Sequence, residues 1–182
     1  MTIGNTPTRY GSAMRCFHGG AIILFLIQIG IGFWGDDFAQ STASFLFMIH
    51  KSVGLVLLFW MVAWTVFRIQ ITRPVWPLTM PVWEQVVAAC AHFLLYAGMW
   101  TMALTGWFFS TAAGRPPVFF TLFTWPMPGV PLSDIWAHRV RDIHEIVAWC
   151  LVALVALHTL AALKHHFWNR DFVLKRMMGR YP

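Results

Sequence analysis

The sequence predicts an all-α integral membrane protein built as a bundle of four helices. Hydrophobic residues make up 58% of the 182-residue chain and charged residues only 11%, and the mean hydropathy is +0.62. An ordinary soluble domain is about half apolar and about a quarter charged. A soluble chain of this length buries too small a fraction of its surface to hide so much apolar area. The length favours one domain over 1–182.

Four apolar runs are long enough to cross a bilayer as helices, because a hydrocarbon core about 30 Å thick needs about 20 apolar residues. The first run carries no charge, and the others are interrupted mainly by histidines. The segments between them hold residues that a membrane helix excludes, such as the five prolines of 114–134. The aromatic residues of that segment predict that it lies on the membrane surface. The predicted spans are 17–34, 43–67, 86–109 and 143–163.

Basic residues are distributed unequally between the two sides of the predicted bundle. The smaller group has four members, Lys51, Arg115, Arg139 and Arg141. The larger group has nine, Arg9, Arg15, Arg68, Arg73, Lys164, Arg170, Lys175, Arg176 and Arg180. Because basic residues favour the cytoplasmic side, both termini are expected in the cytoplasm. The basic tail after Leu163 is expected against anionic lipid headgroups. No basic arm or recognition helix accompanies the formal charge of +6, which excludes nucleic acid as a partner.

The three cysteines give no sign of a metal or redox site. Cys16, Cys90 and Cys150 lie far apart within or next to apolar runs, and no Cys-x-x-Cys spacing occurs. This pattern argues against a disulfide framework, a zinc site or an iron–sulfur cluster. We expect them to be small core residues.

Four histidines fall at two depths in the predicted bundle. His144 and His158 are fourteen residues apart, which places them on one helix face with a rise of about 21 Å between them. His18 begins the first span on the inner side, as His158 does, and His50 lies in the outer part of the second span, as His144 does. A polar ring inside a bilayer requires a functional or structural reason. The depths therefore pair His18 with His158 and His50 with His144.

Paired imidazoles at two depths suit two haems, each with two axial histidines. A haem iron accepts neutral imidazole nitrogens along its axis, and two such ligands leave no open position for oxygen. Arg15, three residues before His18, is placed to neutralise a propionate of the inner haem. Each histidine taken singly also fits a hydrogen-bonded or interfacial role. His138 is the alternative outer ligand, and His165 and His166 are expected at the interface.

His92 interrupts the third span near the level of His158 and has no assigned partner. Such a ring is a functional-site candidate, and an imidazole can donate both a hydrogen bond and protons to a quinone. The alternative is a hydrogen bond to a haem propionate or a neighbouring helix. No phosphate-binding loop or dinucleotide fingerprint occurs, so nicotinamide and ATP are not expected.

Five motifs along the chain carry a family resemblance. They are Arg15 with His18, the run MIHKSVG at 48–54, the run AHFLLY at 91–96, His144-Glu145 with His158 fourteen residues later, and the ending HHFW followed by LKRMM. Together they resemble the bacterial cytochrome b561 family, which is similar to the cytochrome b subunits of hydrogenases and formate dehydrogenases. The resemblance implies a bacterial inner-membrane bundle with two haem b groups that exchanges electrons with quinone; one member oxidises superoxide and reduces ubiquinone.

Three functions remain open on the sequence. The first is an oxidoreductase that takes electrons from superoxide outside and gives them to ubiquinone, with Lys51 next to a proposed ligand attracting the anion. The outer face also carries five carboxylates, so this attraction depends on geometry. The second is a relay subunit docked through 114–134 to a periplasmic dehydrogenase or another respiratory complex. The third is a haem-free structural protein or proton path that uses buried histidines.

Overall fold

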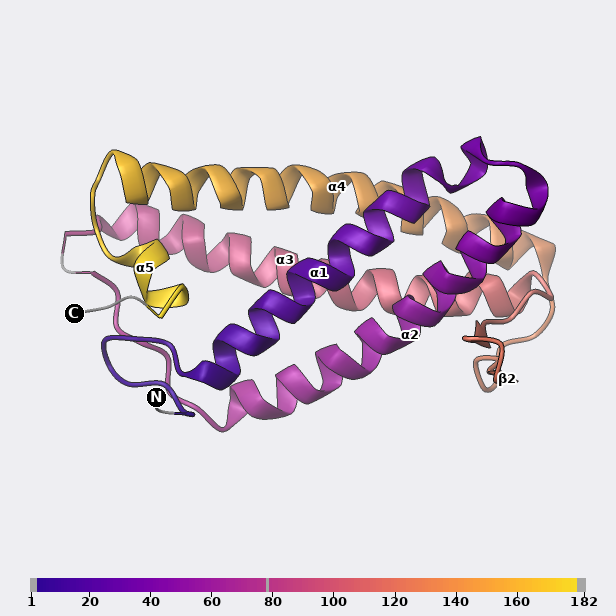
Figure 1. Ribbon diagram of the computed structural model, residues 1–182, viewed down its shortest axis with the longest axis horizontal. Helices are drawn as coiled ribbons and strands as arrows, with labels where there is room; N and C mark the ends of the chain where they lie inside the picture. The colour runs from indigo at the N-terminus through magenta and orange to yellow at the C-terminus, as the bar shows by residue number, and fades with distance from the viewer. Residues whose placement is uncertain (1–2, 78, 180–182) are drawn as a thin grey trace.

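The structure, a computed structural model, describes residues 3–77 and 79–179, most of which lie in helices (Figure 1). The long helices are α1 (Ser12–Trp34), α2 (Gln40–Ile69), α3 (Val82–Ala112) and α4 (Asp134–Phe167). All four are long and apolar enough to cross a membrane. The prediction of an all-α membrane bundle is confirmed. Each helix also extends past its predicted span at one end or both, because helices continue through polar turns that hydropathy excludes.

Shorter elements connect or follow the long helices. They are the 3-10 turn η1 (Gly35–Asp37), the strands β1 (Val118–Phe119) and β2 (Phe123–Thr124), and the helix α5 (Val173–Met177). The two strands pair antiparallel as a small hairpin within the proline-rich segment. Figure 1 shows this hairpin at one end of the bundle and α5 at the other. We call these the hairpin end and the termini end.

Small residues let the long helices approach closely, as is usual in membranes. A Cβ on Gly98 of α3 would lie 2.6 Å from Leu151 of α4, and one on Gly20 of α1 would lie 2.3 Å from Trp60 of α2. The indole of Trp60 also donates a hydrogen bond to the carbonyl of Phe17 over 3.0 Å. These contacts fix α1 against α2 and α3 against α4, which positions the histidines that the helices carry.

The hairpin is fastened to α2 beside the outer histidines. Ser52 is fully buried, and its hydroxyl accepts a hydrogen bond from the amide of Phe120 at 2.9 Å and lies 3.0 Å from the carbonyl of Val118. The ammonium of Lys51 donates to the carbonyl of Arg115 over 2.8 Å. The segment expected on the membrane surface therefore folds back onto the end of the bundle.

Both described ends of the chain lie at the termini end (Figure 1). The amide side chain of Asn5 donates to the carbonyl of Thr72 over 2.9 Å, and Arg176 donates to the carbonyl of Val75 over 2.7 Å. These bonds tie the two terminal segments to the connection between α2 and α3. The larger basic group belongs to this end, except that Arg180 lies outside the described residues.

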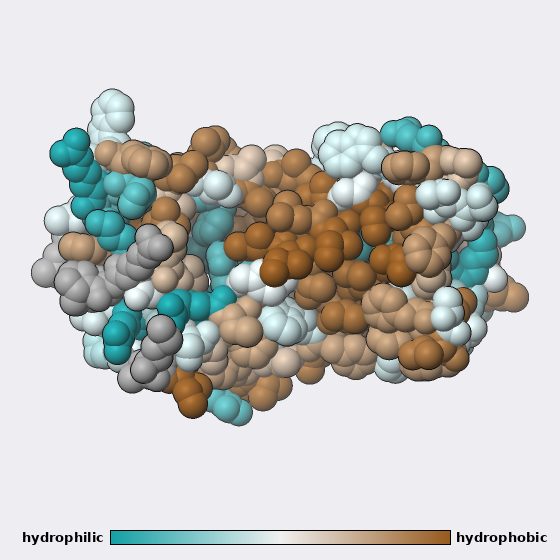
Figure 2. Space-filling view, in the orientation of Figure 1, coloured by the Kyte–Doolittle hydropathy of each residue, from teal (hydrophilic) through white to brown (hydrophobic). Residues whose placement is uncertain are grey.

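Apolar side chains cover much of the middle of the face in Figure 2, and hydrophilic ones gather toward the two ends. Large hydrophobic residues such as Ile23, Phe93 and Leu157 are more than half exposed. The three cysteines are also free and exposed on this outer surface, so the expectation that they are core residues was wrong. In a membrane helix the lipid-facing side is as apolar as the core, so composition alone does not separate the two.

Candidate functional site

The structure brings the four histidines together in two pairs drawn from three helices. His18 of α1 faces His158 of α4 with the ring centroids 6.3 Å apart. His50 of α2 faces His144 of α4 with the centroids 6.5 Å apart. These are the same partners that depth pairs in the sequence, and α4 contributes one ring to each level.

Each separation suits a metal ion between the two rings. Two metal–imidazole bonds of about 2 Å each, together with the half-widths of the rings, place the centroids about 6.4 Å apart. Among residues 3–77 and 79–179, no group of three or more His, Cys, Asp or Glu side chains could hold a metal ion unaided. A haem brings its own equatorial nitrogens and takes only axial ligands from the protein. The donor set therefore fits a haem at each pair better than a bare ion.

The rings at the hairpin end are oriented by their neighbours. The hydroxyl of Thr105 lies 2.9 Å from Nδ1 of His144, which leaves Nε2 of that ring available as a ligand. A Cβ on Gly106 would lie 3.1 Å from Cε1 of His144, and one on Gly32 would lie 3.4 Å from Cε1 of His50. Nδ1 of His50 is buried and has no hydrogen-bond partner in the described part of the chain. Glycine at both positions thus keeps the space beside the rings open.

A cavity of about 920 Å³ surrounds this pair between the helices at the hairpin end. Its volume lies at the upper end of the usual range for cofactor sites, about 300–1,000 Å³. The cavity is lined by both histidines and by charged or titratable groups, including Asp36, Lys51, Arg115, Asp134, His138, Arg141 and Glu145. Arg141 is bound to Glu145 over 2.7 Å. His138 is exposed, and the ring that faces His50 is that of His144 rather than His138.

His92 joins the pair at the termini end as a third ring. Its centroid lies 5.2 Å from that of His158, and the residue is exposed on the surface of α3. The side chain is therefore in contact with a candidate ligand and accessible from outside the bundle. Arg15 is also near this end, where its guanidinium lies 3.5 Å from the carbonyl of Met178 in the C-terminal segment.

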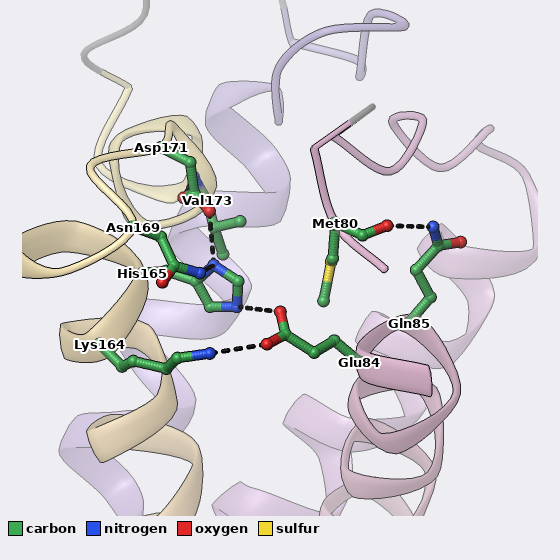
Figure 3. Close-up of polar contacts among 8 residues, drawn as sticks. All are labelled: Met80, Glu84, Gln85, Lys164, His165, Asn169, Asp171 and Val173. Carbon is green, nitrogen blue, oxygen red and sulfur yellow. Dashed lines mark hydrogen bonds and ion pairs between the residues drawn. The ribbon is translucent and has the colours of Figure 1, made fainter. Parts of the chain in front are cut away.

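His165 belongs to a separate polar cluster, which Figure 3 shows between α3 and the C-terminal end of α4. Its Nδ1 lies 2.5 Å from Asp171, its Nε2 lies 3.7 Å from Glu84, and Lys164 donates to Glu84 over 2.6 Å. The residue is 6% exposed, so its ring at the end of α4 is buried among protein groups. Glu84 lies far from His165 in the sequence and Asp171 lies beyond a turn, so no sequence pattern predicts either contact.

Apolar helices that hold imidazole pairs at two depths define a membrane-spanning cytochrome of the b type. The family model described as prokaryotic cytochrome b561 matches residues 9–180, and the chain belongs to this family. It is 30% identical to cytochrome b561 homolog 2 of Escherichia coli (strain K12) over 189 residues, covering 99% of this chain and 96% of that protein. It is 28% identical to cytochrome b561 homolog 1 of the same organism over 145 residues, covering 79% and 81%. The protein is thus a bacterial transmembrane haem b electron-transfer protein.

Proposed function

We propose that the chain, as one domain, carries electrons across most of the bilayer between a donor at the hairpin end and the membrane quinone pool. Two haem b groups are held in this proposal, one by His18 with His158 and one by His50 with His144. The observation that carries the proposal is the pair of ring separations, 6.3 and 6.5 Å, at two levels of α4. A bound haem b supplies reversible one-electron chemistry.

The protein's own residues position the cofactors and restrict their reactivity. A haem at each level would be held by two neutral imidazoles, from His18 with His158 and from His50 with His144, which would deny oxygen an open coordination site. Thr105 holds His144 in one ring orientation, and such a hydrogen bond to the far nitrogen raises the basicity of a ligand. One haem site would suffice if the electron donor and the electron acceptor met on the same face of the membrane. Two levels about 21 Å apart along α4 serve a donor and an acceptor on opposite faces.

We propose superoxide as the donor at the hairpin end. Lys51 and Arg115 line the cavity around His50 and His144, together with the carboxylates Asp36 and Asp134, so the attraction for a small anion is local to the two cations. Arg141 shares its charge with Glu145, which leaves Lys51 and Arg115 as the main attraction. Each superoxide gives up one electron and leaves as oxygen, so two superoxide ions supply the electrons that convert one quinone to quinol.

We place quinone reduction at the termini end, with His92 as the contact residue. The ring is exposed on α3, where a lipid-soluble quinone has access to it, and it lies against the candidate ligand His158. Reduction of a quinone to a quinol also takes up two protons, and a neutral imidazole can donate a hydrogen bond and pass on a proton. The excess of basic residues at this end supports a cytoplasmic location for it.

A relay subunit is the second candidate, and the exposed apolar hairpin favours it. Leu122 is 73% exposed and Phe123 is 49% exposed at the tip of the bundle. A periplasmic dehydrogenase or another respiratory complex docked here would then deliver the electrons. Stopped-flow mixing of the isolated protein with superoxide separates the two candidates, because only the self-contained oxidoreductase is reduced rapidly without a partner.

A visible spectrum of the reduced protein tests the haem assignment itself. Two bound haem b groups produce a b-type α-band with two components and two haems per chain. A spectrum without that band would favour the third function, a haem-free protein in which the buried histidines stabilise the structure or conduct protons.

A further inference from the structure

A second cavity, of about 550 Å³, lies between α2 and α3 near the termini end of the bundle. Its lining includes the polar residues Arg68, Arg73 and Tyr96. It also includes the apolar residues Ile69 and Phe93, which are 78% and 69% exposed on the bundle surface. The groove therefore joins two positive charges to a surface that faces lipid.

The arginines of this groove are not neutralised by the described part of the protein. The guanidinium of Arg68 lies 5.1 Å from the centroid of the Tyr96 ring, a contact that leaves its positive charge in place. No described carboxylate forms an ion pair with Arg68 or Arg73. The carboxylates nearest this end in the fold, Glu84 and Asp171, are bound to Lys164 and His165 (Figure 3).

A neighbouring phenol does not neutralise them either. Burial raises the pKa of Tyr10, and the positive charges of Arg176, Arg68 and Arg73 oppose that shift without overcoming it. The phenol therefore remains protonated at neutral pH, and the positive field around it is unbalanced.

We propose that this groove binds one anionic phospholipid, with its phosphate on Arg68 and Arg73 and an acyl chain along Ile69 and Phe93. Basic pockets between membrane helices on the cytoplasmic side are suited to anionic headgroups. A quinone offers no negative charge to two guanidinium groups, and His92 is not among the residues that line the groove. The lipid site thus adjoins the proposed quinone contact, since His92 directly precedes Phe93 in α3, but it uses different side chains.

The test is native mass spectrometry of the full chain in detergent with added phosphatidylglycerol or phosphatidylcholine of equal chain length. The wild-type protein is expected to retain phosphatidylglycerol in preference. Each arginine near the lipid surface strengthens binding about fivefold, so Arg68→Gln with Arg73→Gln lowers the affinity about 25-fold. Arg139→Gln is the matched control, because Arg139 also lies over an aromatic ring, Trp136, at the hairpin end. It is expected to bind phosphatidylglycerol as the wild type does.

Equal retention of the two lipids by the wild type would overturn the proposal, as would unchanged retention by the double variant. Displacement of phosphatidylglycerol by ubiquinone at matched concentration would assign the groove to quinone instead. Soluble glycerol phosphate is expected not to compete, and competition equal to that of the lipid would reduce the site to a simple anion site. If the double variant is not recovered folded, Arg73→Gln alone serves, because Arg73 is exposed and outside the helices. About a fivefold loss is then expected.

Discussion

Single side chains decide how the histidine pairs of this bundle are held. His144 is fixed through one ring nitrogen by Thr105, whereas Nδ1 of His50 is buried without a partner in the described part of the chain. The two rings of one pair are thus supported unequally. Removing a hydrogen bond of this kind commonly lowers metal affinity about 10- to 100-fold.

Thr105→Val is therefore expected to weaken haem retention at the hairpin end while it preserves the shape of the side chain. The loss in affinity should be about tenfold or more, measured as haem per chain during dilution in detergent. Thr101→Val is the matched control, because Thr101 lies one turn earlier on α3 and its hydroxyl donates to the carbonyl of Ala97 over 2.9 Å rather than to a histidine. Equal losses in both variants would show that the effect comes from the helix and not from His144.

Changing either histidine of a pair to alanine should remove one haem and one component of the α-band. His18→Ala and His158→Ala are expected to remove the same component, and His50→Ala the other, because the rings meet in two separate pairs. Haem content and the yield extracted into detergent are measured together, since loss of a ligand also destabilises the bundle. If His18→Ala and His50→Ala abolish the same component, the pairing is wrong.

His92→Gln is expected to lower quinone reduction about 100-fold, in the range that general acid–base groups contribute. The measurement is the quinone-dependent rate of haem reoxidation at unchanged haem content. Because the ring of His92 contacts that of His158, the spectrum of the inner component must be checked in the same sample. A normal rate with both components intact would remove His92 from the mechanism.

At the scale of the element, the long helices could be predicted from the sequence, whereas the hairpin and the C-terminal cluster could not. A run of about 20 apolar residues has few alternatives to a membrane helix. Strands of two residues are too short to show a periodic pattern in the sequence. Nothing in the sequence indicates that Ser52 forms hydrogen bonds with Val118 and Phe120. The burial of His165 depends on Glu84, some eighty positions earlier in the chain. The pairing of the histidines could be predicted because the fixed helical rise per residue converts spacing in the sequence into depth along the helix.

Ser52→Ala is expected to loosen the hairpin from α2, since it leaves the amide of Phe120 without its partner. Loss of such a hydrogen bond costs about 0.5–1.5 kcal/mol, and hydrogen exchange over 114–133 should accelerate accordingly. Ser44→Ala is the matched control, because Ser44 is an exposed residue of the same helix that bonds only within α2. Unchanged exchange in Ser52→Ala would mean that the proline-rich segment holds its own shape.

At the scale of the whole molecule, charge and hydropathy follow the long axis. Apolar residues occupy much of the middle of the face in Figure 2, and hydrophilic residues gather toward both ends. The larger basic group lies at the termini end, which is the distribution that sets orientation in bacterial membranes.

A reporter fused to the C-terminus is expected to report a cytoplasmic location. A fluorescent protein that folds only in the cytoplasm should be bright there, and alkaline phosphatase, which is active only in the periplasm, should be inactive. Fusions at 129, in the loop between β2 and α4, should give the opposite pair of results. Phosphatase activity at the C-terminus would reverse the orientation and with it the side from which the donor approaches.

One continuous helix, α4, contributes a ring to both histidine pairs, so the two pairs are mechanically linked. The spacing between His144 and His158 is set by unbroken α4, in which they lie fourteen positions apart, so it does not change when other helices shift. The opposite rings come from α1 and α2, which pack against each other through Gly20 and Trp60. A displacement of this helix pair relative to α4 therefore changes both gaps, the one between His18 and His158 and the one between His50 and His144. In the proposed two-haem protein, the packing of α1 and α2 against α4 would adjust both sites together.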